Sequence, residues 1–566
     1  MAGVPLAIGR LLSQLVRIPR RVGRAISGFW FGRSLGFRRR SALVLLILAL
    51  YAVIRFVSLP GVPCQLSPAE ECPPSDDAVA LVADDAFLYA HVNLDHDSSQ
   101  FSKAEDLADK IPHFEAIGQG TFEALDISPR VDLRRDIGSW IGDEAAFAIL
   151  PVGPRGQTPL VLLQLGDERG AERFLASIGR GKPRRARYRD VEIRTYSRGL
   201  TSAELDGFLA LGPVRAVRSA IDAETGKLDS LSSSAQADAV RDELPDNRLA
   251  DVYVSGDGIP RLLAGRGGLA AQLDTFTDFG ASRGIAAAAV AHQDGVEVQI
   301  DSALDPDKVK AQPGFFAAFP SFEPSLAGEF ASDTLLYLGI ADPGETVRLL
   351  LDQANAAAPG VVGAFDRFNR SLRRRGGVDL QKGIFRLLDG EAAIGVAEAR
   401  PVPFATLVVK DVDEDRARRE MAQLQAPIVA ALNPARSGQA PTFGQRKFGD
   451  VVARNVRISP SLDLAYAIFD GKLVVSTDPA GVRQAVEGGD DLGSQDSYQT
   501  VTSSASSGTS ALVFLNLEGL VKRAVPLGLN EIVGGFSTDI AKLRALGLTV
   551  SSSEDRLNTT LFLEID

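Results

Sequence analysis

The pattern of hydrophobic residues changes abruptly within the first sixty positions of the chain. One apolar run extends from Ala42 to Leu59 and is interrupted only by Arg55 and Ser58. About 20 mainly apolar residues are what a single helix needs to cross a bilayer. Nine arginines and no acidic residue precede the run, and the positive-inside rule places such a leader in the cytoplasm. The pattern predicts a cytoplasmic leader over 1–41, one transmembrane helix over 42–59 and an extracytoplasmic remainder.

The residues after the apolar run indicate a stalk rather than a cleavage site. A signal peptidase site has small residues in an A-x-A-like arrangement, whereas a Ser-Leu-Pro-Gly sequence stands here. Residues 60–77 are therefore interpreted as an uncleaved juxtamembrane stalk. The stalk holds the only two cysteines, Cys64 and Cys72, whose spacing in an oxidising compartment favours one small disulfide loop. Two unpaired thiols, or a bridge between two chains, are the alternatives.

Beyond the stalk, strand-like and helix-like patterns alternate. Leu160–Leu165 and Phe404–Val409 are short apolar runs typical of strands, and each precedes a charged amphipathic stretch typical of a helix, Glu168–Ile178 and Glu414–Leu424. Val296–Ile300 alternates apolar and polar residues, as strands do in an antiparallel sheet with one wet face. The chain is therefore predicted to be α+β, with mainly antiparallel sheets.

Short groups of residues occur twice, in the same order, in the two halves of the ectodomain. Asp85–Tyr89 is matched by Asp333–Tyr337, Val131–Leu133 with Gly142–Phe147 by Val378–Leu380 with Asp389–Ile394, Gly207–Leu211 by Gly471–Val475, and Val252–Val254 by Val513–Leu515. Their separation is far longer than the roughly 20–50 residues of a solenoid repeat. The sequence therefore predicts two homologous α+β repeats, 78–320 and 321–566.

Charge is distributed unevenly along the chain. There are 61 Lys and Arg against 72 Asp and Glu, a net charge of −11. Ten of the arginines lie in residues 1–55, which hold no acidic residue, so residues 56–566 carry 51 basic and 72 acidic residues, a net charge of −21. An acidic ectodomain repels other anions, and we expect no nucleic-acid partner.

No residue pattern names a reaction. Glu144 and Glu391 recur at matched places after a Gly/Asp turn, where a carboxylate could act as a base or metal ligand. Recurrence favours instead a role in the fold, in which each carboxylate accepts backbone N–H groups of that turn. Asp95–Asp97, with His96 between the two acids, looks like a metal motif, yet adjacent residues of an extended chain point to opposite faces, so we expect a surface loop. The chain lacks HExxH and Walker patterns, and we expect no G-x-S-x-G elbow of the kind that carries a hydrolase serine. We predict no catalytic residues and no cofactor.

Two basic clusters stand out in the acidic ectodomain. Concentrated arginine pairs well with phosphate or carboxylate groups of lipids and envelope polymers, and a solvated loop or helix face is the alternative. The candidate residues for this anionic contact are Lys182, Arg184, Arg185, Arg187, Arg189, Arg370, Arg373, Arg374 and Arg375.

The leader, the single span, the P-C-x7-C stalk and the paired D-x-x-L-Y and G/D-E-A-A motifs together resemble an uncharacterised bacterial family of membrane-anchored proteins, domain of unknown function 3352. The resemblance covers nearly the whole chain. It implies the anchored topology and brings no activity, cofactor or catalytic residue.

These observations favour a non-catalytic, membrane-anchored binding or scaffold protein of the bacterial cell envelope. Its expected partners are the membrane that holds its anchor and an envelope lipid, polymer or protein. A carrier of lipid or another hydrophobic ligand is the first alternative and needs a curved sheet, backed by helices, that encloses an apolar cavity of roughly 300–1,000 Å³. An envelope hydrolase is the second and needs titratable side chains that converge in a cleft.

Overall fold

A computed structural model gives the structure of the protein. It describes residues 74–111, 137–153, 156–178, 182–196, 199–263, 282–311, 320–345, 387–399, 402–432, 441–459, 462–524, 541–553 and 555–566, with single or paired helical positions between 348 and 374. The predicted leader, transmembrane helix and most of the stalk, with Cys64 and Cys72, lie outside these residues. Within them, no helix combines the length and apolar character needed to span a membrane.

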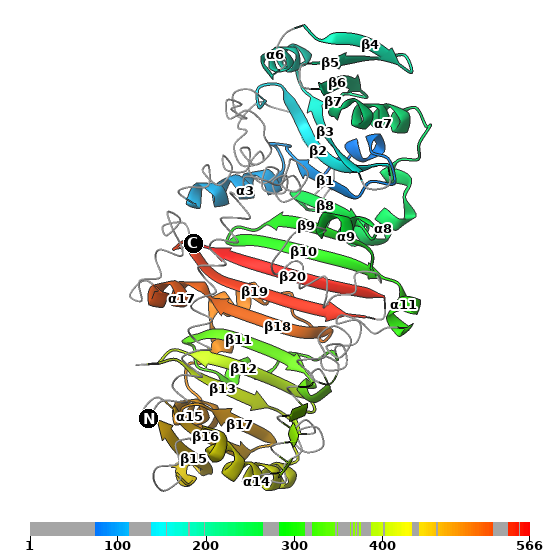
Figure 1. The fold of residues 1–566 in the computed structure, drawn as a ribbon. Helices are drawn as coiled ribbons and strands as arrows, with labels where there is room; N and C mark the ends of the chain where they lie inside the picture. The colour runs from blue at the N-terminus through cyan, green and yellow to red at the C-terminus, as the bar shows by residue number, and fades with distance from the viewer. Residues whose placement is uncertain are drawn as a thin grey trace, which may run out of the picture.

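The strands form one 20-stranded sheet that runs the length of the molecule (Figure 1). They are β1 (Leu88–Asn93), β2 (Ile141–Val152), β3 (Gly156–Leu165), β4 (Arg184–Tyr188), β5 (Val191–Thr195), β6 (Leu200–Leu205), β7 (Phe208–Pro213), β8 (Ala250–Ser255), β9 (Ser282–Ala291), β10 (Gly295–Leu304), β11 (Thr334–Ala341), β12 (Glu391–Ala397), β13 (Phe404–Val409), β14 (Gly444–Phe448), β15 (Val451–Ser459), β16 (Leu462–Phe469), β17 (Lys472–Ser476), β18 (Thr509–Asn516), β19 (Leu543–Ser552) and β20 (Arg556–Ile565).

Every strand pair that the structure describes is antiparallel, and the strand order is the same in the two halves of the chain. From one edge, the first half follows the order β4, β5, β6, β7, β3, β2, β1, β8, β9, β10. The sheet then continues through β20, β19, β18, β11, β12, β13, β17, β16, β15 and β14. Outward from the central β10–β20 pair, each strand of the first half therefore has a counterpart numbered ten higher in the second half.

The register of the strands also agrees between the halves. Tyr89 of β1 lies opposite Tyr253 of β8, and Tyr337 of β11 lies opposite Phe514 of β18. Positions that share a place in strand order and register are called equivalent below. The prediction of an α+β fold with antiparallel sheet is confirmed.

Helices pack on both faces of the sheet. On face A, which carries Tyr89 and Tyr337, buried residues contact η2 (Ala78–Leu81), α7 (Val214–Glu224), η4 (Leu231–Ser233) and α8 (Ala235–Arg241) in the first half, and η6 (Leu326–Glu329), α15 (Pro479–Glu487), η9 (Leu492–Ser494) and α16 (Asp496–Val501) in the second. On face B, they contact α3 (Ser99–Lys110), α6 (Glu168–Ile178) and α14 (Glu414–Leu432). The remaining short helices are α9 (Gly258–Leu263), α11 (Pro306–Ala311) and α17 (Leu517–Ala524).

Local sequence accounts for several of these elements. Asp206-Gly207 joins β6 to β7 and Asp470-Gly471 joins β16 to β17, and all four residues have positive φ, at 40°, 80°, 47° and 68°. Two-residue hairpins require such left-handed backbone, which Asp-Gly adopts readily. The strand predicted at Phe404–Val409 has the predicted bounds. The helix predicted from Glu414 extends beyond Leu424 to Leu432.

Candidate functional site

A buried glutamate occupies the same place in each half. Glu144 of β2 accepts a hydrogen bond of 2.8 Å from the N–H of Ala78, at the start of η2. Equivalent Glu391 of β12 accepts hydrogen bonds from the N–H groups of Ser325 and Leu326, at 2.7 and 3.1 Å, at the start of η6. The first N–H groups of a helix have no partner within the helix, and each carboxylate supplies one. Both glutamates therefore have a role in the fold, as predicted, but the N–H groups that they bind lie 65–67 residues earlier in the chain and not in the turn before each strand.

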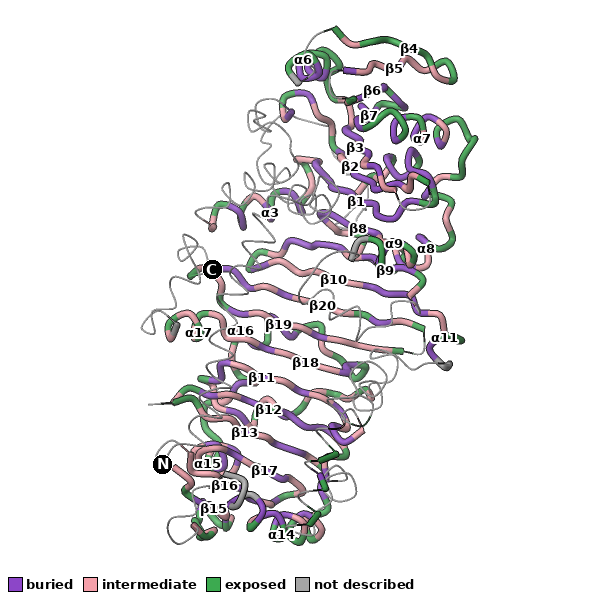
Figure 2. The backbone as a smooth tube through the Cα atoms, viewed as in Figure 1, coloured by how far each residue is buried: buried purple, intermediate pink, exposed green. Residues whose placement is uncertain are grey.

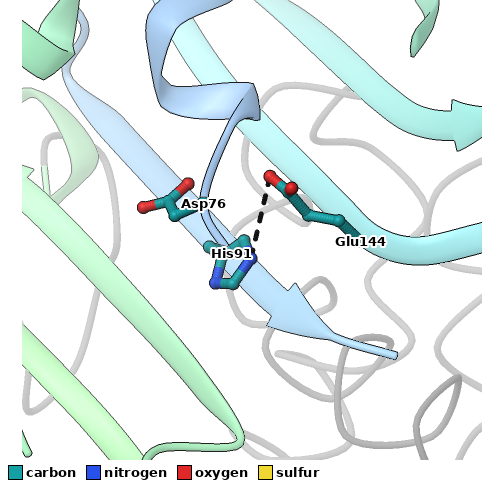
Figure 3. A group of neighbouring side chains, drawn as sticks. All are labelled: Asp76, His91 and Glu144. Carbon is teal, nitrogen blue, oxygen red and sulfur yellow. Dashed lines mark ion pairs between the residues drawn. The ribbon is translucent and has the colours of Figure 1, made fainter. Parts of the chain in front are cut away.

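The first half adds a histidine beside its glutamate. His91 of β1 points toward Glu144 (Figure 3), and its Nε2 lies 3.8 Å from Glu144 Oε1, with both side chains fully buried. That separation is too long for a hydrogen bond, and Nε2 has no hydrogen-bond partner. Gly339 of β11, opposite Leu512 of β18, is the equivalent of His91.

Asp76 completes a group of three side chains with metal-ligand atoms. One carboxylate oxygen of Asp76, one of Glu144 and a ring nitrogen of His91 all lie within 4.8 Å of one another. The hydroxyl of Tyr89 donates a hydrogen bond to Asp76, and Arg241 forms an ion pair with it. These two contacts fix Asp76, from the segment before η2, against β1 and α8.

Asp251 of β8 holds the other side of the imidazole ring. Its Oδ1 lies 3.3 Å from His91 Nδ1 and 2.8 Å from Arg248 Nε, and its Oδ2 lies 3.4 Å from Arg241 Nη2. A proton on Nδ1 that is donated to Asp251 leaves the Nε2 lone pair of a neutral imidazole facing Glu144. The two guanidinium groups compensate the charge of a carboxylate that water does not reach.

Burial and charge shift the pKa values of this cluster strongly. Burial raises the pKa of Glu144 to about 7, against the lowering effect of His91. Burial lowers the pKa of His91, but its hydrogen bond to Asp251 and the surrounding carboxylate charges outweigh burial and raise it. Burial likewise opposes ionisation of Asp251, yet His91, Arg248 and Arg241 hold its pKa well below the usual range. Burial thus favours the protonated form of Glu144, and the surrounding carboxylates favour the protonated form of His91.

A second feature of the sheet is a wide aliphatic surface on face B. One row of mutually opposed residues crosses eight neighbouring strands without a polar side chain: Ala289, Val298, Leu561, Leu548, Val513, Leu338, Ile394 and Leu407. A neighbouring row contains Leu563, Leu546, Leu515, Leu336 and Val396. We call the members of both rows on β10, β20, β19, β18, β11 and β12 the aliphatic face. Strands are spaced by about 4.8 Å, so this face extends for roughly 24 Å across the sheet.

The aliphatic face is less buried than the opposite side of the same strands. In Figure 2, buried and intermediate residues alternate along β18 and β11. Leu512 and Phe514 on face A are about 1% exposed, whereas Val513 between them is only partly buried and Ile394 is 41% exposed. Apart from Leu563, none of the aliphatic face belongs to the hydrophobic clusters that the described residues form. It is apolar surface that these clusters do not bury.

The first basic cluster lies on one hairpin. Lys182, Arg184, Arg185, Arg187 and Arg189 are exposed on β4 and its flanks. Arg185 lies 3.6 Å from Glu192, and Arg189 forms an ion pair with Asp222.

The second basic cluster is on a helical segment of the other half. Arg370, Arg373 and Arg374 are exposed there, and Arg375 lies outside the described residues.

Asp95 and Asp97 flank a turn before α3. The ring of His96, between them, packs edge-on against Phe101, with 4.3 Å between the ring centroids. That segment is the loop that the sequence predicted.

The cluster around His91 was not predicted from the sequence. Its members are separated by up to 175 residues, from Asp76 to Asp251, and no short motif joins them. A signal was nevertheless present in the matched halves, because the offsets of the matched motifs align His91 with Gly339 and Asp251 with Leu512. Where a polar or charged residue of one half is equivalent to an apolar residue of the other, the shared fold does not require the polar side chain.

The chain belongs to the DUF3352 family, described as a protein of unknown function, over residues 41–565. Two crystal forms of TP0453 are distantly similar in structure. Form I is 10% identical, with 41% of this chain and 79% of that chain covered and a TM-score of 0.23. Form IV is 9% identical, with 43% and 86% covered and a TM-score of 0.24. No curated protein matches the chain.

Proposed function

We propose that this DUF3352 protein is a membrane-anchored, extracytoplasmic binding protein that holds the acyl chains of membrane lipids on its aliphatic face. The observation that carries the proposal is the unbroken row of aliphatic side chains, from Val298 through Leu561 and Leu548 to Ile394. Contiguous apolar surface of this extent marks an interaction site in a soluble domain. Hydrocarbon is the occupant that such a surface accepts without an unpaired polar group.

The predicted topology supports the choice of a lipid. An anchor at 42–59, with a cytoplasmic leader before it, would keep the sheet next to a bilayer. The acidic charge of residues 56–566 disfavours anionic polymers as the main ligand. The exposed arginines of β4 lie at the outer edge of the sheet and are a separate candidate contact for phosphate groups of the membrane surface.

We further infer that the two halves arose by duplication, with a boundary near residue 320. The matched strand order supports this inference, as do the similar sequence offsets, which are 247 between Glu144 and Glu391 and 261 between Tyr253 and Phe514.

Photocrosslinking tests the lipid proposal on the full-length protein. The chain is reconstituted in vesicles that contain a phospholipid with a photoreactive group on its acyl chain, and labelled peptides are mapped. Label is expected on β10, β20, β19 and β18, besides any in the membrane span. Leu561→Glu should lower labelling of the sheet by roughly tenfold, because it places a charge among hydrocarbon contacts.

Thr560→Glu is the matched control. Thr560 is the neighbouring residue of β20 and points to the opposite face, paired with Gln299 and Thr549. It introduces the same charge on the same strand, so labelling should stay near the unmodified level. Label confined to residues before 60, or equal loss in the two variants, would show that the aliphatic face does not hold lipid.

A further inference from the structure

The cluster around His91 contains more than the fold needs. In the second half, Glu391 caps η6 without a histidine, an aspartate or an arginine at the equivalent positions: Gly339 replaces His91 and Leu512 replaces Asp251. The shared architecture therefore requires the glutamate only. The other groups of the first half call for a separate explanation, one that does not depend on lipid binding.

The unpaired ring nitrogen is the observation that points to a ligand. His91 is 0% exposed, and its Nε2 has no hydrogen-bond partner. Leaving such a buried polar atom unpaired is costly. The nitrogen faces a carboxylate oxygen of Glu144 at 3.8 Å, and Asp76 lies on the remaining side (Figure 3). A cation between the three side chains would satisfy the nitrogen and both carboxylates at once.

The arrangement of Asp251 is that of a partner to a metal-binding histidine. Such histidines generally donate their second ring N–H to a carboxylate, which fixes the tautomer and orients the ring. Asp251 Oδ1 lies 3.3 Å from His91 Nδ1. Arg248 and Arg241 neutralise Asp251, so its negative charge does not add to that of the other two carboxylates.

We propose that Asp76, His91 and Glu144 bind a divalent first-row transition-metal ion, with Zn²⁺ as the ion that the ligand set suits best. Imidazole selects against Ca²⁺ and Mg²⁺, which prefer oxygen ligands, and one imidazole with two carboxylates suits Zn²⁺. Bonds of about 2.0–2.2 Å require ligand atoms about 3.4 Å apart, so binding draws together atoms that now lie within 4.8 Å. The ion would fasten the segment before η2, which leads from the stalk, to β1 and β2.

Zinc binding by the full-length protein in detergent tests the proposal. The protein is stripped with a chelator, exposed to zinc and dialysed, and bound metal is measured by mass spectrometry. One zinc ion per chain is expected. His91→Gln and Glu144→Gln should each weaken binding by roughly tenfold or more. Glu144→Gln retains an oxygen that can accept the Ala78 N–H, so η2 keeps its cap.

The control variant is His292→Gln. His292 lies 3.2 Å from Glu297 on another part of the sheet, so this variant removes a histidine without touching the cluster and should bind like the unmodified protein. Cobalt substitution gives a second readout, a visible absorption band that disappears in His91→Gln. Circular dichroism confirms that each variant is folded. Absence of zinc from the unmodified protein would overturn the proposal. Equal zinc in His91→Gln would show an adventitious ion only and would overturn it too.

Discussion

The two halves share the same strand order and register, but the side chains at their centres differ. Beside β1 and β8, the first half buries His91 and Asp251 among arginines and carboxylates. Beside β11 and β18, the second half packs aromatic rings instead, with Tyr498 at 5.9 Å from Tyr337 and 5.4 Å from Phe514. The same strand order thus tolerates an ionic centre or an aromatic one. The fold therefore does not require the ionic cluster, and four experiments test this difference between the two halves.

The largest effect is expected from Asp251→Leu, which gives the first half the residue of the second. Arg248 and Arg241 would lose a buried counter-charge, and removing one partner of a buried ion pair costs about 3–5 kcal/mol of unfolding free energy. Guanidinium denaturation followed by the fluorescence of buried Trp140 measures it. Leu512→Met is the control and should cost less than about 1.5 kcal/mol. Equal losses would show that the charges are not coupled.

Alkaline pH should destabilise the aromatic centre. Burial raises the pKa of Tyr498 to about 12, so the unfolded chain releases this proton from about pH 10 and the folded chain retains it. The free energy of unfolding therefore falls as pH rises from 10 toward 12, by up to about 3 kcal/mol. Denaturation at several pH values should give a flatter dependence for Tyr498→Phe than for the unmodified protein. The same pH dependence of the unfolding free energy in both proteins would show that Tyr498 does not cause the loss.

Tyr89 and Tyr337 are equivalent residues with opposite hydroxyl environments. Tyr89 donates a hydrogen bond to Asp76, whereas the buried hydroxyl of Tyr337 has no hydrogen-bond partner. Tyr89→Phe should cost about 1–3 kcal/mol of unfolding free energy, and Tyr337→Phe should be neutral or stabilising. Thermal unfolding of the two variants compares them directly. A larger loss for Tyr337→Phe would reverse the expected order.

The smallest effect is expected at the edge of the sheet. Arg185 is 67% exposed and lies 3.6 Å from Glu192, and exposed ion pairs contribute about 0–1 kcal/mol. Arg185→Ala should therefore leave the denaturation midpoint nearly unchanged. A loss as large as that of Asp251→Leu would mean that this surface is buried in an assembly.

Local patterns predicted the elements of this fold better than its sites. Apolar runs such as Phe404–Val409 mark buried strands because alternate residues face two helical layers, and the Glu168–Ile178 period marks a helix, whose bounds the structure reproduces. A structural role for Glu144 and Glu391 followed from their recurrence, but the helix starts that they cap, 66 residues earlier, did not.

The ionic cluster could not be predicted in the same way. It depends on contacts between residues far apart in the chain, such as His91 and Asp251, 160 positions apart. A strand pattern indicates that position 91 is on the sheet but not which strand lies beside it, because that neighbour is set by the long-range pairing of β1 with β8. The extent of the aliphatic face likewise depends on strand order across both halves.

The position of β20 has a consequence for how the protein is made. β20 is synthesised after all the other strands described here, yet it lies at the centre, between β10 and β19. Until Arg556–Ile565 has emerged, both of those strands expose a full edge of unpaired N–H and C=O groups, the kind of edge that recruits other chains. Chaperones must therefore shield the two exposed edges of the nascent chain until β20 has been synthesised. A stop codon just before Arg556 would leave two aggregation-prone half-sheets rather than a slightly shortened protein.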